Sequence, residues 1–171
     1  MDLRSYIRDV PDFPKKGIVF KDITPLLSDK DALHYALSTL ADRFKDRGIT
    51  KVVGIESRGY IFAPAIALGL RAGFVPVRKP GKLPWQTLAE EYELEYGKDR
   101  LEIHVDAICP GENVLIVDDL LATGGTASAA HRLVKRLRGV VVGSGFLVEL
   151  AFLEGRARLP GMDVVSLIEY R

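Results

Sequence analysis

The stretch VLIVDDLLATGGTA, residues 114–127, contains the features that decide the fold of this chain. Four apolar residues run directly into two adjacent carboxylates, Asp118 and Asp119, and a loop of small residues soon follows. A continuous apolar run of this kind is typical of a strand that is buried on both faces of a parallel sheet. The sequence therefore predicts a strand over 114–117 with two acids at its carboxyl end.

The small-residue loop after the acids has the composition of an anion site. Its glycines leave backbone N–H groups unobstructed and permit positive φ angles, and a helix is predicted to begin directly after it. The amino terminus of a helix offers unpaired N–H donors and a partial positive charge, so a phosphate can bind there without a lysine. The expected phosphate-binding residues are Ala122, Thr123, Gly124, Gly125 and Thr126.

Asp118 and Asp119 suit a different group from the phosphate. Ionised carboxylates accept hydrogen bonds but cannot donate them, so they fit a pair of sugar hydroxyls. A ribose 5-phosphate satisfies the whole stretch, with its phosphate in the loop and its vicinal hydroxyls on the acids. Two alternatives stay open. One is a Walker-B strand for magnesium, although the chain has no G-x-x-x-x-G-K-[ST] motif; the other is an ordinary strand–turn–helix with two surface aspartates.

Length and composition limit the classes to which the chain can belong. Its 171 residues, 47% apolar and 27% charged, suit a single soluble domain. A formal net charge of +1 argues against broad nucleic-acid binding, and the single cysteine excludes an internal disulfide. The chain shows no signal peptide and no run near the ~18 apolar residues of a membrane span. We therefore expect a cytoplasmic protein without a membrane or nucleic-acid partner.

Predicted strands and helices alternate along the chain, which is typical of βαβ units. The expected fold is α/β, with a largely parallel sheet flanked by helices and ligands beyond the carboxyl ends of the strands. The polar stretch 78–100 is predicted to be a long connection, as lids often are. Apolar patterns predict helices over 31–47, 59–71 and 126–137, and strands over 51–55, 74–77, 114–117, 140–147 and 164–168.

Residues 118–126, DDLLATGGT, resemble the diphosphoribosyl-binding motif of the type I phosphoribosyltransferase family. Further segments, in the order in which the family has them, extend the resemblance nearly end to end to members that act on adenine. These segments are FPKKGIVFKDI (13–23), GIESRG (54–59), RKPGKLP (78–84), LEYG (94–97) and LVEL (147–150).

The resemblance implies a type I phosphoribosyltransferase fold in a single domain over 1–171. Within it, residues 1–28 would recognise the base and residues 78–104 would form a mobile hood. The implied reaction transfers the phosphoribosyl group of 5-phosphoribosyl 1-diphosphate to N9 of adenine, releasing diphosphate and AMP in purine salvage.

The resemblance also assigns roles in catalysis and diphosphate binding. Glu95, with Tyr96 beside it, would act as a general acid or base on the purine. Arg58 and Lys82 would stabilise the departing diphosphate, and Arg78 or Lys79 is a candidate to reach the site of a neighbouring subunit. The family has a cis peptide in segment 56–59, which a sequence cannot show. The implied diphosphate-binding residues are Ser57, Arg58, Arg78, Lys79 and Lys82.

For the base, the resemblance points to the N-terminal segment and the end of a late strand. Val19 would pair with the adenine edge through its main chain, while Phe20 and Leu150 would flank the ring. Lys21 stands where many relatives carry arginine, and a lysine offers a point charge in place of a planar fork. A direct base contact by Lys21 therefore stays open. Without the resemblance, Val19 and Phe20 could equally be core residues.

The expected cofactor is Mg²⁺, held by substrate oxygens and water with no direct protein ligand. The expected partners are adenine and 5-phosphoribosyl 1-diphosphate, and the expected assembly is a homodimer. Two alternatives stay open: the same chemistry on another purine base, and a non-catalytic regulator that senses phosphoribosyl diphosphate. The basic residues of the hood and Glu95 favour turnover.

Overall fold

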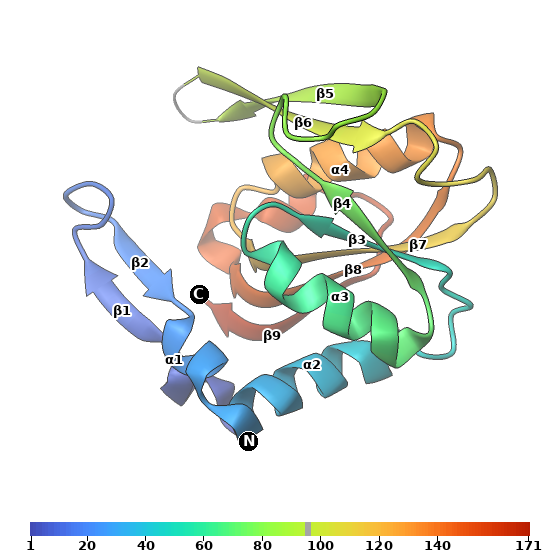
Figure 1. Ribbon diagram of the computed structural model, residues 1–171. Coiled ribbons are helices and arrows are strands. Elements are labelled where there is room, and N and C mark those ends of the chain that lie inside the picture. The colour runs from blue at the N-terminus through green and yellow to red at the C-terminus, as the bar shows by residue number, and fades with distance from the viewer. Residues whose placement is uncertain (95–96) are drawn as a thin grey trace.

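A five-stranded parallel sheet forms the centre of the computed structural model, which describes residues 1–94 and 97–171 (Figure 1). The order of its strands is β4-β3-β7-β8-β9, and every neighbouring pair is parallel. This confirms the predicted α/β fold. The strands are β3 (Lys51–Ile55), β4 (Gly73–Val77), β7 (Asn113–Leu121), β8 (Val140–Leu150) and β9 (Val164–Tyr170).

Helices cover both faces of this sheet. The helices α2 (Lys30–Phe44) and α3 (Gly59–Leu70) lie on one face, and α4 (Gly125–Arg136) lies on the other (Figure 1). Asp29 caps the start of α2 by accepting hydrogen bonds from two backbone N–H groups. Among the described residues, no helix is long and apolar enough to cross a membrane.

β7 is longer than the predicted strand, and its extension includes both acids. Its pairing with β3 ends at Gly54 and Val117, whereas its pairing with β8 continues to Leu121. The prediction that the strand ends before Asp118 was therefore wrong, because ladder hydrogen bonds to β8 hold the polar residues in the strand. On the β3 side, the residues beyond Val117 have no neighbouring strand.

The hood contains an antiparallel hairpin of β5 (Thr87–Leu94) and β6 (Gly97–His104), where the sequence predicted a long polar connection. Apolar residues do alternate here: Tyr92, Leu101 and Ile103 are buried in the cluster that includes α4. The acidic residues that lie between these apolar residues hid the alternation in the sequence. Glu90 shares the face of Tyr92, and two arginines of α4 neutralise it.

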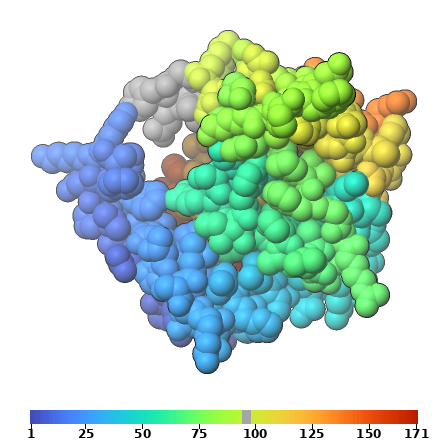
Figure 2. All heavy atoms as spheres, viewed as in Figure 1, coloured from blue at the N-terminus to red at the C-terminus, as the bar shows by residue number. Residues whose placement is uncertain are grey.

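The N-terminal segment forms a second antiparallel hairpin, β1 (Arg8–Pro11) with β2 (Val19–Asp22). It stands apart from the central sheet (Figure 1), and Figure 2 shows a hollow between this hairpin and the rest of the molecule. Val19 begins β2, so its main chain lies in a strand. The short helices are η1 (Leu3–Tyr6), α1 (Thr24–Ser28), η2 (Ala151–Leu153) and η3 (Gly155–Arg158).

Candidate active site

The acids and the small-residue loop share a cavity of about 490 Å³. The cavity lies at the carboxyl ends of β3 and β7, where ligands bind in parallel sheets. Asp118, Asp119 and the whole phosphate loop, which we define as residues 122–126, line it. Ser57, Arg58 and Lys79 line it from other parts of the chain. The structure thus brings together most of the residues expected to bind ribose phosphate and diphosphate.

The phosphate loop leads directly into the N-terminus of α4. Gly124 is the N-cap residue, has a φ of 80°, and makes no side-chain cap hydrogen bond. The first N–H groups of a helix have no intrahelical partner, and here the residues that carry them, Gly125 and Thr126, line the cavity. A Cβ atom on Gly124 would lie 2.3 Å from the carbonyl oxygen of Gly155, so only glycine fits. The loop therefore has the geometry of an anion site.

Asp119 is nearly buried, with 4% of its surface exposed, and it faces the same cavity. The Nε atom of Arg58 lies 2.8 Å from its Oδ2 atom. The geometry of this ion pair is not that of a hydrogen bond, and Oδ2 has no hydrogen-bond partner among the described residues. A buried carboxylate oxygen without a partner is costly. Asp119 is therefore prepared to accept a hydrogen bond from a ligand.

Burial raises the pKa of Asp118 well above its ordinary value, and repulsion from Asp119 raises it further. Burial also raises the pKa of Asp119, against the opposing effect of Arg58. The sequence argument treated both groups as ionised acceptors. In the folded chain, burial and mutual repulsion therefore disfavour two full negative charges on this pair.

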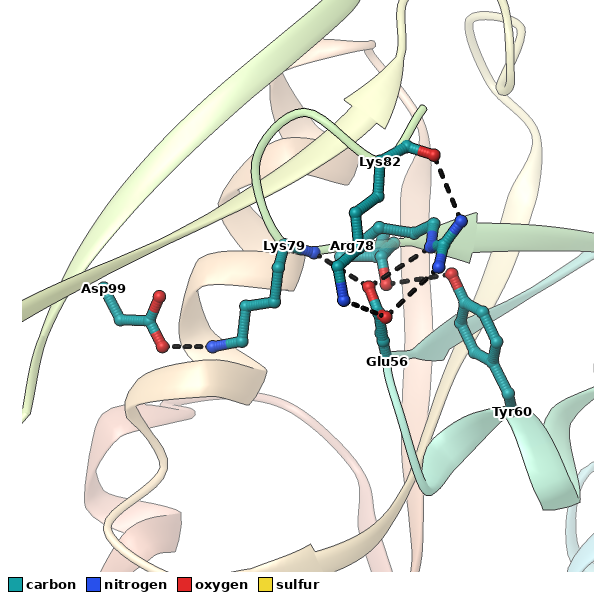
Figure 3. A network of polar contacts seen from close by, with 7 residues as sticks. Glu56, Tyr60, Arg78, Lys79, Lys82 and Asp99 are labelled. Atoms are coloured by element: carbon teal, nitrogen blue, oxygen red, sulfur yellow. Dashed lines mark hydrogen bonds and ion pairs between the residues drawn. The ribbon is translucent and has the colours of Figure 1, made fainter. Parts of the chain in front are cut away.

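Three basic residues of the hood, Arg78, Lys79 and Lys82, pair with acids in this structure (Figure 3). Arg78 donates to both carboxylate oxygens of Glu56 at 3.2 Å, and the Lys82 ammonium donates to one of them at 2.7 Å. The Lys79 backbone N–H donates to the same carboxylate at 3.1 Å. Arg78 and Lys82 are absent from the lining of the cavity, so Glu56 holds these two cations beside it.

Lys79 lines the cavity of its own chain, and its ammonium group contacts a second acid, Asp99 (Figure 3). Its ammonium pairs with Asp99 and donates to the Tyr92 hydroxyl at 3.0 Å, while that hydroxyl donates to Asp99 at 3.0 Å. Sequence reasoning missed Glu56, Tyr92 and Asp99. The register of the hood hairpin, which pairs Tyr92 with Asp99, was the signal that could have found the last two.

We expect Glu56 to make stability depend on pH in the acidic range. Hydrogen bonds from Arg78 are the largest cause that lowers the pKa of Glu56 from 4.5 to about 2 in the folded chain. A lowered folded-state pKa stabilises the fold above pH 4.5, and this stability is lost as the pH falls toward 2. Denaturant midpoints at pH 7, 4 and 3 should fall less steeply for Glu56→Gln than for the unchanged chain. Parallel slopes would contradict the assignment.

The residues expected at the base lie beside the cavity and do not line it. The Arg58 guanidinium lies over the Phe20 ring, 5.1 Å from its centroid, and so connects the two regions. Val19 is 48% exposed. The Lys21 ammonium is held by Asp9 at 2.7 Å and lies over the Tyr170 ring.

The remaining predicted positions have different outcomes. Leu150 ends β8 and packs, partly buried, against the core. The Glu56–Ser57 peptide is cis, as the resemblance implies. Glu95 and Tyr96 lie outside the described residues. Within residues 1–94 and 97–171, no three His, Cys, Asp or Glu side chains cluster in a way that could hold a metal ion.

Comparison with known proteins places this geometry in a family. Residues 28–159 match the model of the phosphoribosyl transferase domain. The chain is 60% identical to an adenine phosphoribosyltransferase of Solibacter usitatus and 55% identical to one of Halothermothrix orenii. The first match covers 99% of this chain and 98% of the relative, and the second covers 99% of each.

Solved structures agree with the sequence comparison. The adenine phosphoribosyltransferase from Thermoanaerobacter pseudethanolicus has a TM-score of 0.96 and 53% identity, covering 99% of this chain and 98% of that chain. The enzyme from Saccharomyces cerevisiae, complexed with an imino-altritol bisphosphate and adenine, has a TM-score of 0.91 and 42% identity, covering 97% and 96%. The chain therefore belongs to the type I phosphoribosyltransferase family, within the branch formed by the adenine phosphoribosyltransferases.

Proposed function

We propose that this chain transfers the phosphoribosyl group of 5-phosphoribosyl 1-diphosphate to N9 of adenine, giving AMP and diphosphate. The observation that carries the proposal is buried Asp119, whose Oδ2 atom has no hydrogen-bond partner among the described residues, in one cavity with the N-terminus of α4. A sugar that carries both hydroxyls and a phosphate matches both features. The family membership supports the same reaction, which serves purine salvage.

The phosphate loop and the acid pair would hold the ribose 5-phosphate. Backbone N–H groups of Thr123, Gly124, Gly125 and Thr126 are suited to the 5′-phosphate, with the positive end of α4 behind them. Asp118 and Asp119 would take the vicinal hydroxyls. Two hydroxyl donors fit the acid pair better than a second anion would, because the two carboxyl groups already repel each other.

Diphosphate binding would fall to Ser57, Arg58 and Lys79, which line the same cavity as the phosphate loop. Arg78 and Lys82 are poised at Glu56 and would turn toward the departing diphosphate. Fixed cations stabilise a leaving group that accumulates charge in the transition state more than they stabilise the ground state. That Arg78 or Lys79 reaches the site of a neighbouring subunit stays a prediction.

The base would sit between the cavity and the N-terminal hairpin. Main-chain groups of Val19 would pair with the adenine edge, and Phe20 and Leu150 would flank the ring. Arg58, which contacts both Phe20 and Asp119, would orient base and sugar toward each other. The ammonium of Lys21 is occupied by Asp9 and Tyr170, which argues against a direct base contact.

Glu95, with Tyr96 beside it, would move the proton on the imidazole edge of adenine. Closure of the hood, residues 78–104, would exclude water, which competes with adenine for the sugar. Magnesium would enter with the substrate, bound by diphosphate oxygens and water, and would screen the charge of the leaving group.

A homodimer, a cytoplasmic location and a base-recognition segment over residues 1–28 of a single domain stay predictions from the sequence.

A direct assay tests the proposed function. Purified protein with adenine, 5-phosphoribosyl 1-diphosphate and magnesium should form AMP and diphosphate in equal amounts. Hypoxanthine, guanine and xanthine, offered in competition, should give much less product. If hypoxanthine, guanine or xanthine gave more product than adenine, that purine would replace adenine as the proposed substrate. Tight binding of the donor without any product would favour the non-catalytic sensor.

A further inference from the structure

The segment between β8 and β9, residues 151–163, packs against the phosphate loop. The backbone of Gly155 is the point of contact. A Cβ atom on Gly155 would lie 2.2 Å from the carbonyl oxygen of Ala122, and a Cβ atom on Gly124 would lie 2.3 Å from the carbonyl oxygen of Gly155. Side chains at either position would push the two backbones apart. The position of Gly155 therefore sets the position of the phosphate loop.

A small hydrophobic cluster joins the same two parts of the chain. Leu121 and Ala127, which flank the phosphate loop on either side, are buried with Phe146 and Leu159. Leu159 belongs to the 151–163 segment. The loop itself has few large side chains of its own, so much of its support comes from this segment.

An ion pair next to Gly155 ties the segment to the sheet. Arg156 donates to both oxygens of the Glu149 carboxylate, each at 2.7 Å, and to the carbonyl oxygen of Val164 at 2.9 Å. Glu149 lies near the end of β8 and is 3% exposed. The Ser166 hydroxyl of β9 donates to the same carboxylate at 2.6 Å. Arg156 thereby bridges the end of one strand and the start of the next.

We infer that Arg156 and Glu149 are positioning residues for the 5′-phosphate: their ion pair holds Gly155 against the phosphate loop. Neither residue lines the cavity, so the effect acts through the backbone contact of Gly155. The inference rests on the proposed function, because it assigns a 5′-phosphate to this loop. A bidentate arginine–carboxylate pair is geometrically specific, and a lysine at position 156 would keep the charge but lose the fork.

The test measures binding of ribose 5-phosphate and of adenine separately, by calorimetry, together with KM and kcat. Arg156→Ala should weaken ribose 5-phosphate binding and raise the KM for the diphosphate donor on the order of tenfold, as expected when a catalytic or binding group is displaced slightly. Adenine binding and kcat should change less than twofold. Arg156→Lys should recover part of the loss, because one donor remains.

Arg47→Ala is the matched control. It removes an arginine–aspartate ion pair to Asp163, at the far end of the same segment and away from the phosphate loop. This variant should bind ribose 5-phosphate as the unchanged chain does. An equal loss in Arg47→Ala and Arg156→Ala, or an equal loss of adenine and ribose 5-phosphate affinity, would overturn the inference.

A folding failure of Arg156→Ala and a failure of the proposed function can each be distinguished from a failure of this inference. If Arg156→Ala fails to fold, Glu149→Gln carries the same expectation, since it keeps the side-chain size and removes the charge that Arg156 binds. Unchanged ribose 5-phosphate affinity in Glu149→Gln would then overturn the inference. If the unchanged chain binds ribose 5-phosphate but makes no AMP, the proposed function fails while the positioning role can still be measured.

Discussion

Asp119→Ala is expected to raise the KM for 5-phosphoribosyl 1-diphosphate by about 10- to 100-fold, because one hydrogen bond to a charged group is worth about 1.5–3 kcal/mol. Asp119 is buried, faces the cavity, and has an oxygen atom without a hydrogen-bond partner. Its loss removes the acceptor that the ribose hydroxyls need. The effect should fall on donor binding more than on kcat, since the hydroxyls are bound before and after transfer.

The measurement is steady-state kinetics with each substrate varied in turn. Asp119→Asn, which keeps one oxygen acceptor, should lie between Asp119→Ala and the unchanged chain. Asp163→Ala removes a half-exposed aspartate that pairs with Arg47 and serves as the control, with an expected change below twofold. A donor KM that stays the same in Asp119→Ala would remove the acid pair from the site.

Gly124→Ala is expected to lower kcat/KM for the donor by about 100-fold through displacement of the phosphate loop. Two effects add at this position. The φ of 80° is unfavourable for alanine, and the new Cβ atom would lie 2.3 Å from the carbonyl oxygen of Gly155. Backbone cannot move aside as a flexible side chain can, so the loop itself must shift.

Gly111→Ala separates these two effects. Gly111 has a φ of 85°, and a Cβ atom there would meet nothing within 4 Å. Both variants should therefore lose stability of about 1–2 kcal/mol from the positive φ, which thermal unfolding can measure. Only Gly124→Ala should also lose ribose 5-phosphate binding. Equal catalytic behaviour of the two variants would show that the contact with Gly155 does not control the site.

Much of the sheet could be predicted because its signals are local. The strand predicted over 51–55 coincides with β3, and the helical spacing after Asp29 predicts α2 to within a few residues. The phosphate loop could also be predicted, because glycines directly before a helix are typical of an anion site. Its partner Gly155 could not, because the contact joins residues about 30 positions apart and leaves no pattern in either segment.

The hood shows why the rest could not be read locally. Glu90 looks like one of several solvated acids in a polar run, yet Arg132 and Arg136 of α4 hold it against the helix at 2.6 and 3.1 Å. Arg78 and Lys82 look like free cations, yet Glu56, more than 20 residues earlier, neutralises both. In each case the partner that changes the interpretation is supplied by tertiary structure.

The charge state of the acid pair has the same origin. Two adjacent aspartates indicate a strongly negative site when the sequence is considered alone. Burial at the end of β7 raises the pKa of both groups, and the mutual repulsion of the carboxylates adds to the shift of Asp118. Burial and the neighbouring charges, which tertiary structure supplies, decide how far this shift goes.

A crystal structure of the protein with AMP tests the central claim most directly. We predict that the phosphate oxygens lie about 3 Å from backbone nitrogens of the phosphate loop, and that Asp118 and Asp119 accept hydrogen bonds from the two ribose hydroxyls. AMP bound elsewhere, with residues 118–126 free of ligand, would contradict the account.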